Sequence, residues 1–393
     1  MKQVSSARRL RVLVISPLYF PTEEGLAHYT TEFCRHLAKS ADVSVLTSTA
    51  SENVGSGPGG VEILPWIERW NLRGCLGPMK RALATKPDRI LIQFVPFMYA
   101  RRGGINFSIV ALGALLAIRA AFAHEGRVQV MFHELWYHLS PDPKAVVMHS
   151  AHRAMVLGLS LAARDNFCAT TRFAAEVERN MGPLHGRVHL LAVGSNLERD
   201  DAPLRERPPQ EGKLRVALFG SVHSSKNVPL VLRALHEAAL RAPGRLALTI
   251  IGLTQQDVTA IVPELADFLA ENATIAGPLE ARVAAATLAE QDFLVSYFQD
   301  GVSSRRGSLL AALCEGVPVV TTWNEVSDPV FLDQPSVKLL SCDEQKFKAE
   351  LVHLLVGDER PFASVTAEDV RSFYRAHFSW AAIVERYLEL SAA

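Results

Sequence analysis

The sequence of 393 residues carries 41 Lys and Arg against 41 Asp and Glu, so its formal net charge is zero. This balance argues against a polybasic nucleic-acid-binding protein and against an acidic solvating tail. Apolar residues make up 49% of the chain, which is typical of a folded protein and excludes a disordered one. The length predicts two or three domains.

The two halves of the chain differ in charge. Residues 1–200 have 23 Lys and Arg against 16 Asp and Glu, whereas residues 201–393 have 18 against 25. Either electrostatic attraction between the halves or a partner-facing basic surface on the first half accounts for this difference.

The five cysteines, at positions 34, 75, 168, 314 and 342, show no metal-ligand spacing, and their odd number argues against a full disulfide framework. A reducing, cytoplasmic compartment is therefore expected. The N-terminus has only a short apolar run and predicts a strand rather than a signal peptide. Residues 105–123 are the one candidate membrane segment, but Asn106 and Arg119 interrupt them, which favours a buried or interface-lying helix.

The first half alternates predicted strands and helices. A short, continuously apolar run at residues 11–16 is typical of a parallel strand buried on both faces. Such βαβ alternation predicts a parallel, doubly wound sheet. The further elements expected here are helices at 27–39 and 144–163, strands at 43–47, 89–94, 128–132 and 166–170, and a Gly- and Ser-rich loop at 51–60.

A polar, proline-rich stretch at residues 200–213 has the composition of a linker, and the strand–helix pattern restarts directly after it. The sequence therefore predicts an α/β protein with two domains of similar size, at residues 1–203 and 204–393. Ligands of such sheets bind outside the carboxyl ends of the strands, and a cleft between domains is a preferred site. The elements expected in the second domain are strands at 214–219, 246–252, 293–297 and 317–321, helices at 228–241 and 309–314, and an amphipathic helical stretch at 367–390.

Two loops at predicted strand ends could hold an anion. In the first domain, Gly25 at a helix start lets backbone N–H groups approach a phosphate, although no GxGxxG pattern supports a nicotinamide cofactor. In the second domain, Gly220 and Ser221 end a strand, and Lys226 and Asn227 precede the next helix. A lysine there can place its charge on a phosphate. The alternatives are an ordinary turn at Gly25 and a solvated lysine at position 226.

The segment of residues 300–322 is the most informative. A strand end opens into a Gly- and Ser-rich loop with two adjacent arginines, and a helix follows. Hydroxyl groups, bidentate guanidinium donors and backbone N–H groups at a helix N-terminus together suit a diphosphate. The candidate residues are Asp300, Ser303, Ser304, Arg305, Arg306, Gly307 and Ser308.

His133 follows the strand predicted at 128–132 and could face a cleft as a polar or acid–base group, although a histidine at a strand end is more often structural. His149 and His152 lie three positions apart on a predicted helix, but no carboxylate joins them at the H-E-x-x-H spacing. We therefore expect no metal site.

Together these residues resemble the family 4 glycosyltransferases of the GT-B fold over essentially the whole chain. The resemblance implies two Rossmann-like domains facing across a cleft, with an acceptor on the first and a nucleotide-activated sugar on the second. It also implies a final helix, at about 376–391, that crosses back onto the first domain. The matching motifs are Gly25-x-Ala-x-x-Thr30, FHE at 132–134, VGSN at 193–196, FG-x5-K at 219–226, IG at 251–252, which ends in Gly252, and DGVSSRRGSLLAALCEGVPVVTT at 300–322.

The sequence departs from the family pattern at three positions. Ser221 stands where typical members have arginine. Ser303 and Ala311 stand where they have two glutamates, the second of which holds the ribose hydroxyls. The chain is similar to the subgroup with D-G-x-S-x-R-R at this place, so Arg305 and Arg306 are the expected substitutes.

The resemblance implies transfer of a sugar from a nucleotide diphosphate donor to a hydroxyl acceptor, with retention and without a required metal or cofactor. Lys226 and Arg306 would act on the leaving diphosphate, and His133 would contact the sugar or orient the acceptor. Bacterial polysaccharide or glycoconjugate synthesis is the expected setting.

The expected acceptor is a saccharide or a lipid-linked saccharide, and nucleic acid is not an expected partner. The basic first half could bring a cytoplasmic protein into peripheral contact with the inner face of the membrane. Two alternatives stay open. One is a nucleotide-sugar epimerase of the same fold, and the other is a catalytically inactive partner subunit, which Ser221 and the missing glutamates favour.

Overall fold

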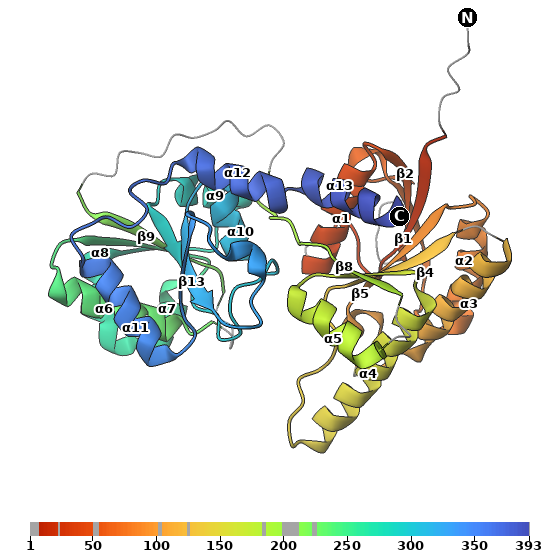
Figure 1. Ribbon diagram of the computed structural model, residues 1–393, viewed down its shortest axis with the longest axis horizontal. Coiled ribbons are helices and arrows are strands. Elements are labelled where there is room, and N and C mark those ends of the chain that lie inside the picture. Colours follow the sequence, from red (N-terminus) through yellow and green to blue (C-terminus); the bar gives the residue numbers. More distant parts are fainter. Residues whose placement is uncertain are drawn as a thin grey trace, which may run out of the picture. The chain divides into compact units, whose positions relative to one another are not determined.

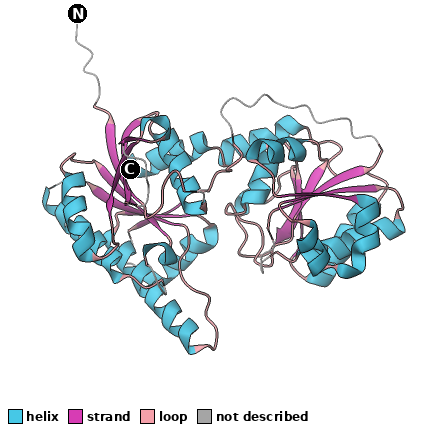
Figure 2. Cartoon of the chain, turned by 180° about the vertical axis from the view of Figure 1, so that it is seen from behind, coloured by secondary structure: helices cyan, strands magenta, loops and turns pink. Residues whose placement is uncertain are grey.

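The computed structural model describes residues 8–22, 24–49, 55–100, 104–123, 126–182, 186–198, 212–221 and 226–392. Contacts between residues divide the chain into two compact units. The first comprises Met1–Ala192 together with Ile383–Ala393, and the second comprises Val193–Ala382. Each unit contains one sheet with helices on both faces (Figures 1 and 2). Of the linker predicted at 200–213, residues 200–211 lie outside the described residues.

The first unit contains a sheet that is parallel except for a short antiparallel strand at one edge. All six residues of Arg89–Phe94 are buried, as expected of a parallel strand covered on both faces. The strand order changes direction between β1 and β5. In spatial order the strands are β3 (Gly55–Ser56), β4 (Glu62–Ile67), β2 (Ala41–Ser48), β1 (Leu10–Ile15), β5 (Arg89–Phe94), β6 (Arg127–Phe132), β7 (Asp165–Cys168) and β8 (Arg187–Leu190).

Helices α2 to α5 follow one another along this sheet, each in contact with the next. Their apolar sides, with residues such as Met79, Leu112 and Leu159, join strand residues such as Ile92 and Phe132 in one buried core. The helices of the first unit are α1 (Gly25–Leu37), α2 (Leu72–Leu83), α3 (Phe107–Ala123), α4 (Pro143–Ala162), α5 (Thr171–Met181) and most of α13 (Trp380–Ala392).

The second unit contains a six-stranded, fully parallel sheet with its own core. Numbered along the chain, its strands have the spatial order 3-2-1-4-5-6 of a doubly wound nucleotide-binding sheet. That order is β11 (Ala273–Gly277), β10 (Leu246–Ile251), β9 (Leu214–Phe219), β12 (Phe293–Val295), β13 (Val319–Trp323) and β14 (Val337–Ser341). Its helices are α6 (Val228–Arg241), α7 (Gln255–Ile261), α8 (Ala266–Asn272), α9 (Ala281–Ala289), α10 (Gly307–Cys314), α11 (Glu344–Val356) and α12 (Ala367–His377).

The end of the chain belongs to the core of the first unit. Tyr387 of α13 is completely buried, and its hydroxyl donates to Oε1 of Gln129 on β6 over 2.7 Å. Its ring centroid lies 5.2 Å from that of Phe33 and 5.3 Å from that of Phe167. One side chain from the last helix therefore joins helix α1 to strands β6 and β7 of the first sheet.

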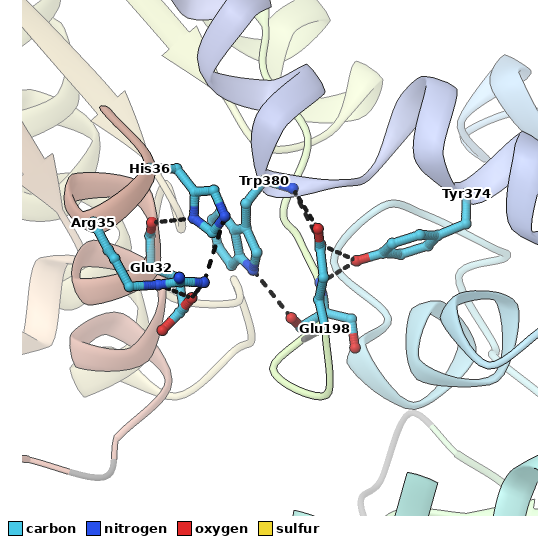
Figure 3. A network of polar contacts seen from close by, with 7 residues as sticks. Glu32, Arg35, His36, Glu198, Tyr374 and Trp380 are labelled. Carbon is cyan, nitrogen blue, oxygen red and sulfur yellow. Dashed lines mark hydrogen bonds and ion pairs between the residues drawn. The ribbon is translucent and has the colours of Figure 1, made fainter. Parts of the chain in front are cut away.

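Within the second unit, the segment that begins at Val193 is held by side chains near residue 380 (Figure 3). The Tyr374 hydroxyl accepts from the Ser195 N–H over 3.0 Å and donates to a Glu198 carboxylate oxygen over 2.8 Å. The backbone N–H of Trp380 donates to the same carboxylate, and its indole N–H donates to the Ser195 carbonyl over 3.1 Å. The two places where the chain changes unit are thus tied to each other.

The predicted fold class, two parallel-sheet α/β domains with a C-terminal helix, is confirmed. Two details differ. The final helical stretch is broken, because α12 ends at His377 and α13 begins at Trp380, with Phe378 and Ser379 between them. Strand β12 ends at Val295, two residues before the predicted end, and the chain then leaves the sheet to form a loop.

Candidate functional site

In the second unit, the residues expected to bind an anion gather where the strand order changes direction. Strand β9 ends at Phe219 between β10 and β12, and helices α6 and α10 begin beside it. A pocket at this strand end is lined by Gly220, Ser221, Lys226 and Ser308, with Tyr297 beside them. Ligands of open α/β sheets bind at such a point, outside the carboxyl ends of the strands.

Gly220 makes room for the lysine. Its backbone has a φ of +123°, which side chains with a Cβ atom rarely adopt. A Cβ added there would lie 2.6 Å from Nζ of Lys226 and 3.7 Å from Cβ of Ser308. A side chain at position 220 would therefore strain the backbone and displace the ammonium group from the end of β9.

Lys226 is half-buried, and no hydrogen bond or ion pair of its ammonium group is found with the described residues. Burial lowers the pKa of this ammonium group, and the positive charge of Arg306 lowers it further. A partly desolvated cation beside another cation is costly unless an anion neutralises it. The position is therefore suited to an anionic ligand.

Arg306 is the second cation of the site. It is the residue before α10, and its side chain is 16% exposed. Its guanidinium carbon lies 4.3 Å from the centre of the Phe298 ring, and its guanidinium group forms an ion pair with Asp300. Burial lowers the pKa of Arg306, and Asp300 opposes part of this shift. One edge of the guanidinium, at Nε, is buried without a hydrogen-bond partner among the described residues.

Ser308 supplies the third polar group. Its hydroxyl is also buried with no hydrogen-bond partner in the part of the chain that the structure describes. Buried polar groups are normally paired, so the Ser308 hydroxyl and the Arg306 Nε, both buried without partners among the described residues, indicate missing acceptors close to the half-buried Lys226 ammonium group. An anion with several oxygens, such as a phosphate or diphosphate, suits donors of these kinds.

The loop before α10 is held by residues that follow β13 along the chain. The backbone N–H of Ser304 donates to the buried carboxylate of Asp328 over 2.7 Å, and the Asp328 N–H donates to the Val302 carbonyl. Gly301 has a φ of +75°, and a Cβ there would lie 2.1 Å from Oγ of Ser327. The loop therefore has a fixed course that depends on a glycine and a buried carboxylate.

The remaining residues expected at this site lie around it in different ways. Ser303 accepts the Arg306 N–H at its carbonyl, whereas Arg305 and Gly307 are exposed. Asn227 caps α6, because its side chain accepts from the Leu230 N–H over 3.1 Å and donates to Glu344. Gly252 follows β10 and lies directly against the backbone of Gly220. Of the predicted set, Lys226, Arg306 and Ser308 present polar groups without partners in the described chain, at the pocket or beside it.

The expected residues of the first unit also lie at carboxyl ends of strands. His133 follows β6, its Nε2 lies 2.7 Å from Oε1 of Gln93, and its ring packs edge-on against Tyr29 at 4.4 Å. Gly25 is the first residue of α1, exposed, with open space where a Cβ would be. His133 is thus a half-buried, oriented polar group, and Gly25 leaves the start of α1 accessible.

The two histidines expected on the helix at 144–163 have structural partners. His149 contacts the carbonyl of Tyr137, and His152 contacts the carbonyl of Gly104 and the N–H of Tyr137. Among the described residues, no three His, Cys, Asp or Glu side chains come together in a group that could hold a metal ion.

Solved structures share this architecture over nearly the whole chain. Sucrose-phosphate synthase from Thermosynechococcus elongatus gives a TM-score of 0.63 at 14% identity, with 98% of each chain covered. HepE of Anabaena in complex with UDP gives 0.63 at 14% identity, covering 98% of this chain and 100% of its own. WaaG, a glycosyltransferase involved in lipopolysaccharide biosynthesis, gives 0.60 at 15% identity, covering 96% and 99%. The chain has the GT-B fold.

No protein-family model and no curated protein matches the sequence, so the likeness is one of fold. Three residues that contact or position the candidate residues of the two units were not expected from the sequence. Phe298, under the Arg306 guanidinium, and Asp328, which fixes the loop, lie outside the matched motif. Gln93, which contacts His133, was predicted from the sequence only as part of a strand. A polar residue inside the buried run RILIQF was the one signal that could have singled it out.

Proposed function

We propose that the chain is a glycosyltransferase that moves a sugar from a nucleotide diphosphate donor to a hydroxyl group of an acceptor. The observation that carries the proposal is a half-buried ammonium group, on Lys226 beside the end of β9, next to two buried polar atoms without partners among the described residues, Nε of Arg306 and Oγ of Ser308. The HepE structure, which has the same fold, was solved with UDP and glucose.

The chemistry of the reaction explains why cations belong at this place. As the bond between the sugar and the phosphate breaks, negative charge grows on the diphosphate and positive character grows on the sugar. Donors fixed in advance around the diphosphate stabilise that state more than the ground state. Lys226 supplies a point charge, and Arg306, held by Phe298 and Asp300, supplies an oriented guanidinium.

We take the transfer to proceed with retention and without a required metal ion, as the sequence resemblance implies. In that scheme the leaving phosphate accepts the proton of the acceptor hydroxyl, so no strong protein base is needed. His133 would contact the sugar or orient the acceptor, and its contact with Gln93 fixes the direction of its ring. Retained activity in EDTA and an unchanged anomeric configuration by NMR would support this part.

The binding of the ribose must differ from the family pattern. Ala311 stands where typical members have the ribose-binding glutamate, and it is buried inside α10 without a polar side chain. A residue other than 311 therefore has to meet the ribose hydroxyls if a nucleotide binds here. We expect the nucleotide specificity to be set by the loop of residues 300–308 and its surroundings.

The direct test is a thermal-shift screen with nucleotide diphosphates and their sugars, followed by product analysis. A ligand at 100 times its dissociation constant stabilises a protein by about 2.7 kcal/mol. The variants Lys226→Ala and Arg306→Ala should each lose this shift and lower turnover by about a hundredfold or more. The matched variants Lys338→Ala and Arg282→Ala, at exposed positions of the same unit, should keep both.

Each outcome distinguishes one alternative. Intact turnover in both site variants would overturn the assignment. An epimerised sugar nucleotide instead of a glycosylated product would identify an epimerase. Nucleotide-sugar binding without hydrolysis or transfer across a panel of donors and acceptors would identify an inactive partner subunit.

For the acceptor we propose a saccharide, free or linked to a lipid, in polysaccharide or glycoconjugate synthesis. WaaG, of the same fold, is involved in lipopolysaccharide biosynthesis. The excess of Lys and Arg in residues 1–200 supports a cytoplasmic enzyme that meets the membrane peripherally.

A further inference from the structure

Two exposed aromatic side chains lie beyond the carboxyl ends of neighbouring strands in the first unit. Phe97 belongs to the short helical turn Pro96–Tyr99, directly after β5, and Tyr137 follows β6. Strands β5 and β6 pair in parallel, so both segments leave the sheet at the same edge. Phe97 is 40% exposed and Tyr137 43%, and their ring centroids lie 6.0 Å apart. We call this pair the aromatic platform.

Tyr137 is held in place by its main chain. Its carbonyl accepts from Nδ1 of His149 over 2.8 Å, and its N–H donates to Nδ1 of His152 over 3.2 Å. Nε2 of His152 in turn donates to the carbonyl of Gly104 over 3.0 Å. Burial lowers the pKa of His152, so its ring is neutral at neutral pH and its Nδ1 remains an acceptor. Two histidines of α4 therefore fix the backbone of Tyr137 while its ring stays exposed.

Phe97 is fixed by packing. Its ring lies edge-on to that of His152, with 4.9 Å between the ring centroids. A Cβ added to Gly104, whose φ is +66°, would lie 2.6 Å from the Phe97 ring, so the chain at position 104 passes directly against that ring. Large aromatic side chains normally pack in a core, so two that are both exposed and fixed indicate a binding surface. A surface fixed in advance loses less entropy when a ligand binds.

Polar groups border the aromatic platform. His138, the residue after Tyr137, is exposed, and the guanidinium carbon of Arg153 lies 6.0 Å from the centre of the Trp136 ring. Aromatic rings with hydrogen-bonding groups at their border suit a ligand that has apolar faces and a polar edge. A sugar ring has this construction, because its C–H groups form the faces and its hydroxyl groups point outward.

We infer that the aromatic platform holds a sugar ring of a saccharide in the corner between Phe97 and Tyr137, whose ring planes cross at 69°. Tyr137 follows His133 by four residues, and four residues of extended chain span at most about 14 Å. A saccharide of a few units can therefore contact the platform and His133 together. Calling this saccharide the acceptor of the transfer rests on the proposed function, whereas its binding to the platform does not.

Other ligands suit the platform less well. A nucleobase is flat and gains most from a ring that lies parallel to it on each side, whereas the two rings of the platform cross steeply. An apolar partner would also cover the exposed aliphatic side chains that follow, such as Leu139 and Val147. The position of Val147 therefore supplies a matched control.

Saturation-transfer NMR on the full chain tests the platform, with maltotriose, cellotriose and chitotriose as probes. Wild type should transfer saturation to at least one of the three. Titrations should show that Tyr137→Ala and Phe97→Ala each weaken this binding roughly fivefold or more, because a stacked sugar loses one of its aromatic contacts. Tyr137→Phe keeps the ring and should keep the affinity within about twofold. Val147→Ser, at a more exposed apolar position on α4, should change nothing.

Three outcomes would overturn the platform. The first is that none of the three trisaccharides receives saturation, or that both alanine variants bind them as wild type does. The second is a loss in Val147→Ser as large as that in Tyr137→Ala, which would indicate a general apolar surface. The third is a saturation signal from UDP alone that Tyr137→Ala abolishes, which would indicate a nucleotide site. Unchanged melting temperatures of the variants would exclude unfolding as the cause of a loss.

The thermal shift with UDP, measured on the same variants, is independent of the platform. Trisaccharide binding in a protein that shows neither a UDP shift nor transfer would contradict the proposed function and leave the platform in place. A UDP shift and transfer without trisaccharide binding would contradict the platform alone. Where transfer is detected, Tyr137→Ala should raise the KM for the acceptor several-fold with kcat nearly unchanged, because the lost contact serves binding.

Discussion

Lys226 holds its ammonium group half-buried beside the charge of Arg306, and no carboxylate of the described residues is paired with it. A buried charge that lacks a counterion destabilises the folded protein, and replacing it with an apolar side chain of similar length is often stabilising. The unliganded site therefore costs stability, which an anionic ligand restores on binding.

We expect Lys226→Met to raise the free energy of unfolding of the unliganded protein by about 1 kcal/mol and to abolish stabilisation by UDP. Both quantities can be read from urea unfolding curves with and without the nucleotide. The variant Lys338→Met, at an exposed position on β14, should change neither. A variant that is less stable than wild type, or that still binds UDP, would contradict the role assigned to Lys226.

The pH dependence of the stability gained by Lys226→Met gives a second test. The pKa of Lys226 is lowered in the folded state from its usual 10.5, so the folded protein releases this proton at a lower pH than the unfolded chain. Between the two pKa values the unfolded chain binds more protons, and the stability of wild type rises with pH. The advantage of Lys226→Met should therefore be complete below the folded pKa and vanish as the pH approaches 10.5.

At the scale of elements, the loop between β12 and α10 depends on one backbone conformation. Gly301→Ala places a Cβ where φ is +75°, 2.1 Å from the Ser327 hydroxyl and 2.6 Å from the Asn324 amide oxygen. We expect a loss of about 2–3 kcal/mol in unfolding free energy and a weaker UDP shift, because the loop carries Arg306.

Gly277→Ala is the matched control for this variant. Its φ is +69°, but nothing lies within 4 Å of an added Cβ. Only the conformational cost of about 1 kcal/mol should appear, with UDP binding intact. Equal losses in both variants would show that the contacts with Ser327 and Asn324 do not matter.

The elements that the sequence predicted well are those whose signal is local. Strand β5 is a short, fully buried and mostly apolar run, and α6 is an amphipathic helix with an Asn cap and a proline in its first turn. The C-terminal stretch was predicted as helical over 367–390 with a final helix from about 376, because its apolar residues keep a helical spacing. At the break, Phe378 stacks on Phe331, and the Ser379 hydroxyl accepts from the Ala382 N–H at the start of α13.

The candidate site, too, was predicted best where its signal is local in the sequence. The residue types at the end of β9 and before α10 pointed to an anion, and the structure brings Lys226 and Ser308 to one pocket, with the Arg306 charge close to Lys226. What the sequence could not show is which of two adjacent arginines turns inward. Phe298 and Asp300 hold Arg306 in place, whereas Arg305 is exposed. That difference depends on a loop conformation fixed by Asp328, more than 20 residues away.

At the scale of the whole molecule, the chain passes between its units twice, and the residues next to both passages are joined. Glu198 accepts from the Tyr374 hydroxyl and from the Trp380 backbone (Figure 3). Burial raises the pKa of the Tyr374 hydroxyl well above its usual value, so it stays a donor at any physiological pH.

Glu198→Ala would leave the Tyr374 hydroxyl and the Trp380 N–H without their acceptor. We expect a loss of about 1–3 kcal/mol in unfolding free energy and faster protease cleavage near residue 198, with the UDP shift retained. Glu359→Ala, at an exposed position with no such contacts among the described residues, is the control. Cleavage at an unchanged rate would show that other contacts hold the two passages together.

The return of the last helix to the first unit has a consequence for the order of events on the ribosome. Tyr387 fills the space between Phe33 and Phe167, so the first unit lacks part of its core until almost the whole chain has been made. The second unit is one continuous stretch that itself runs to Ala382 and buries Trp380 completely. Both units can therefore complete their cores only when the end of the chain has been made.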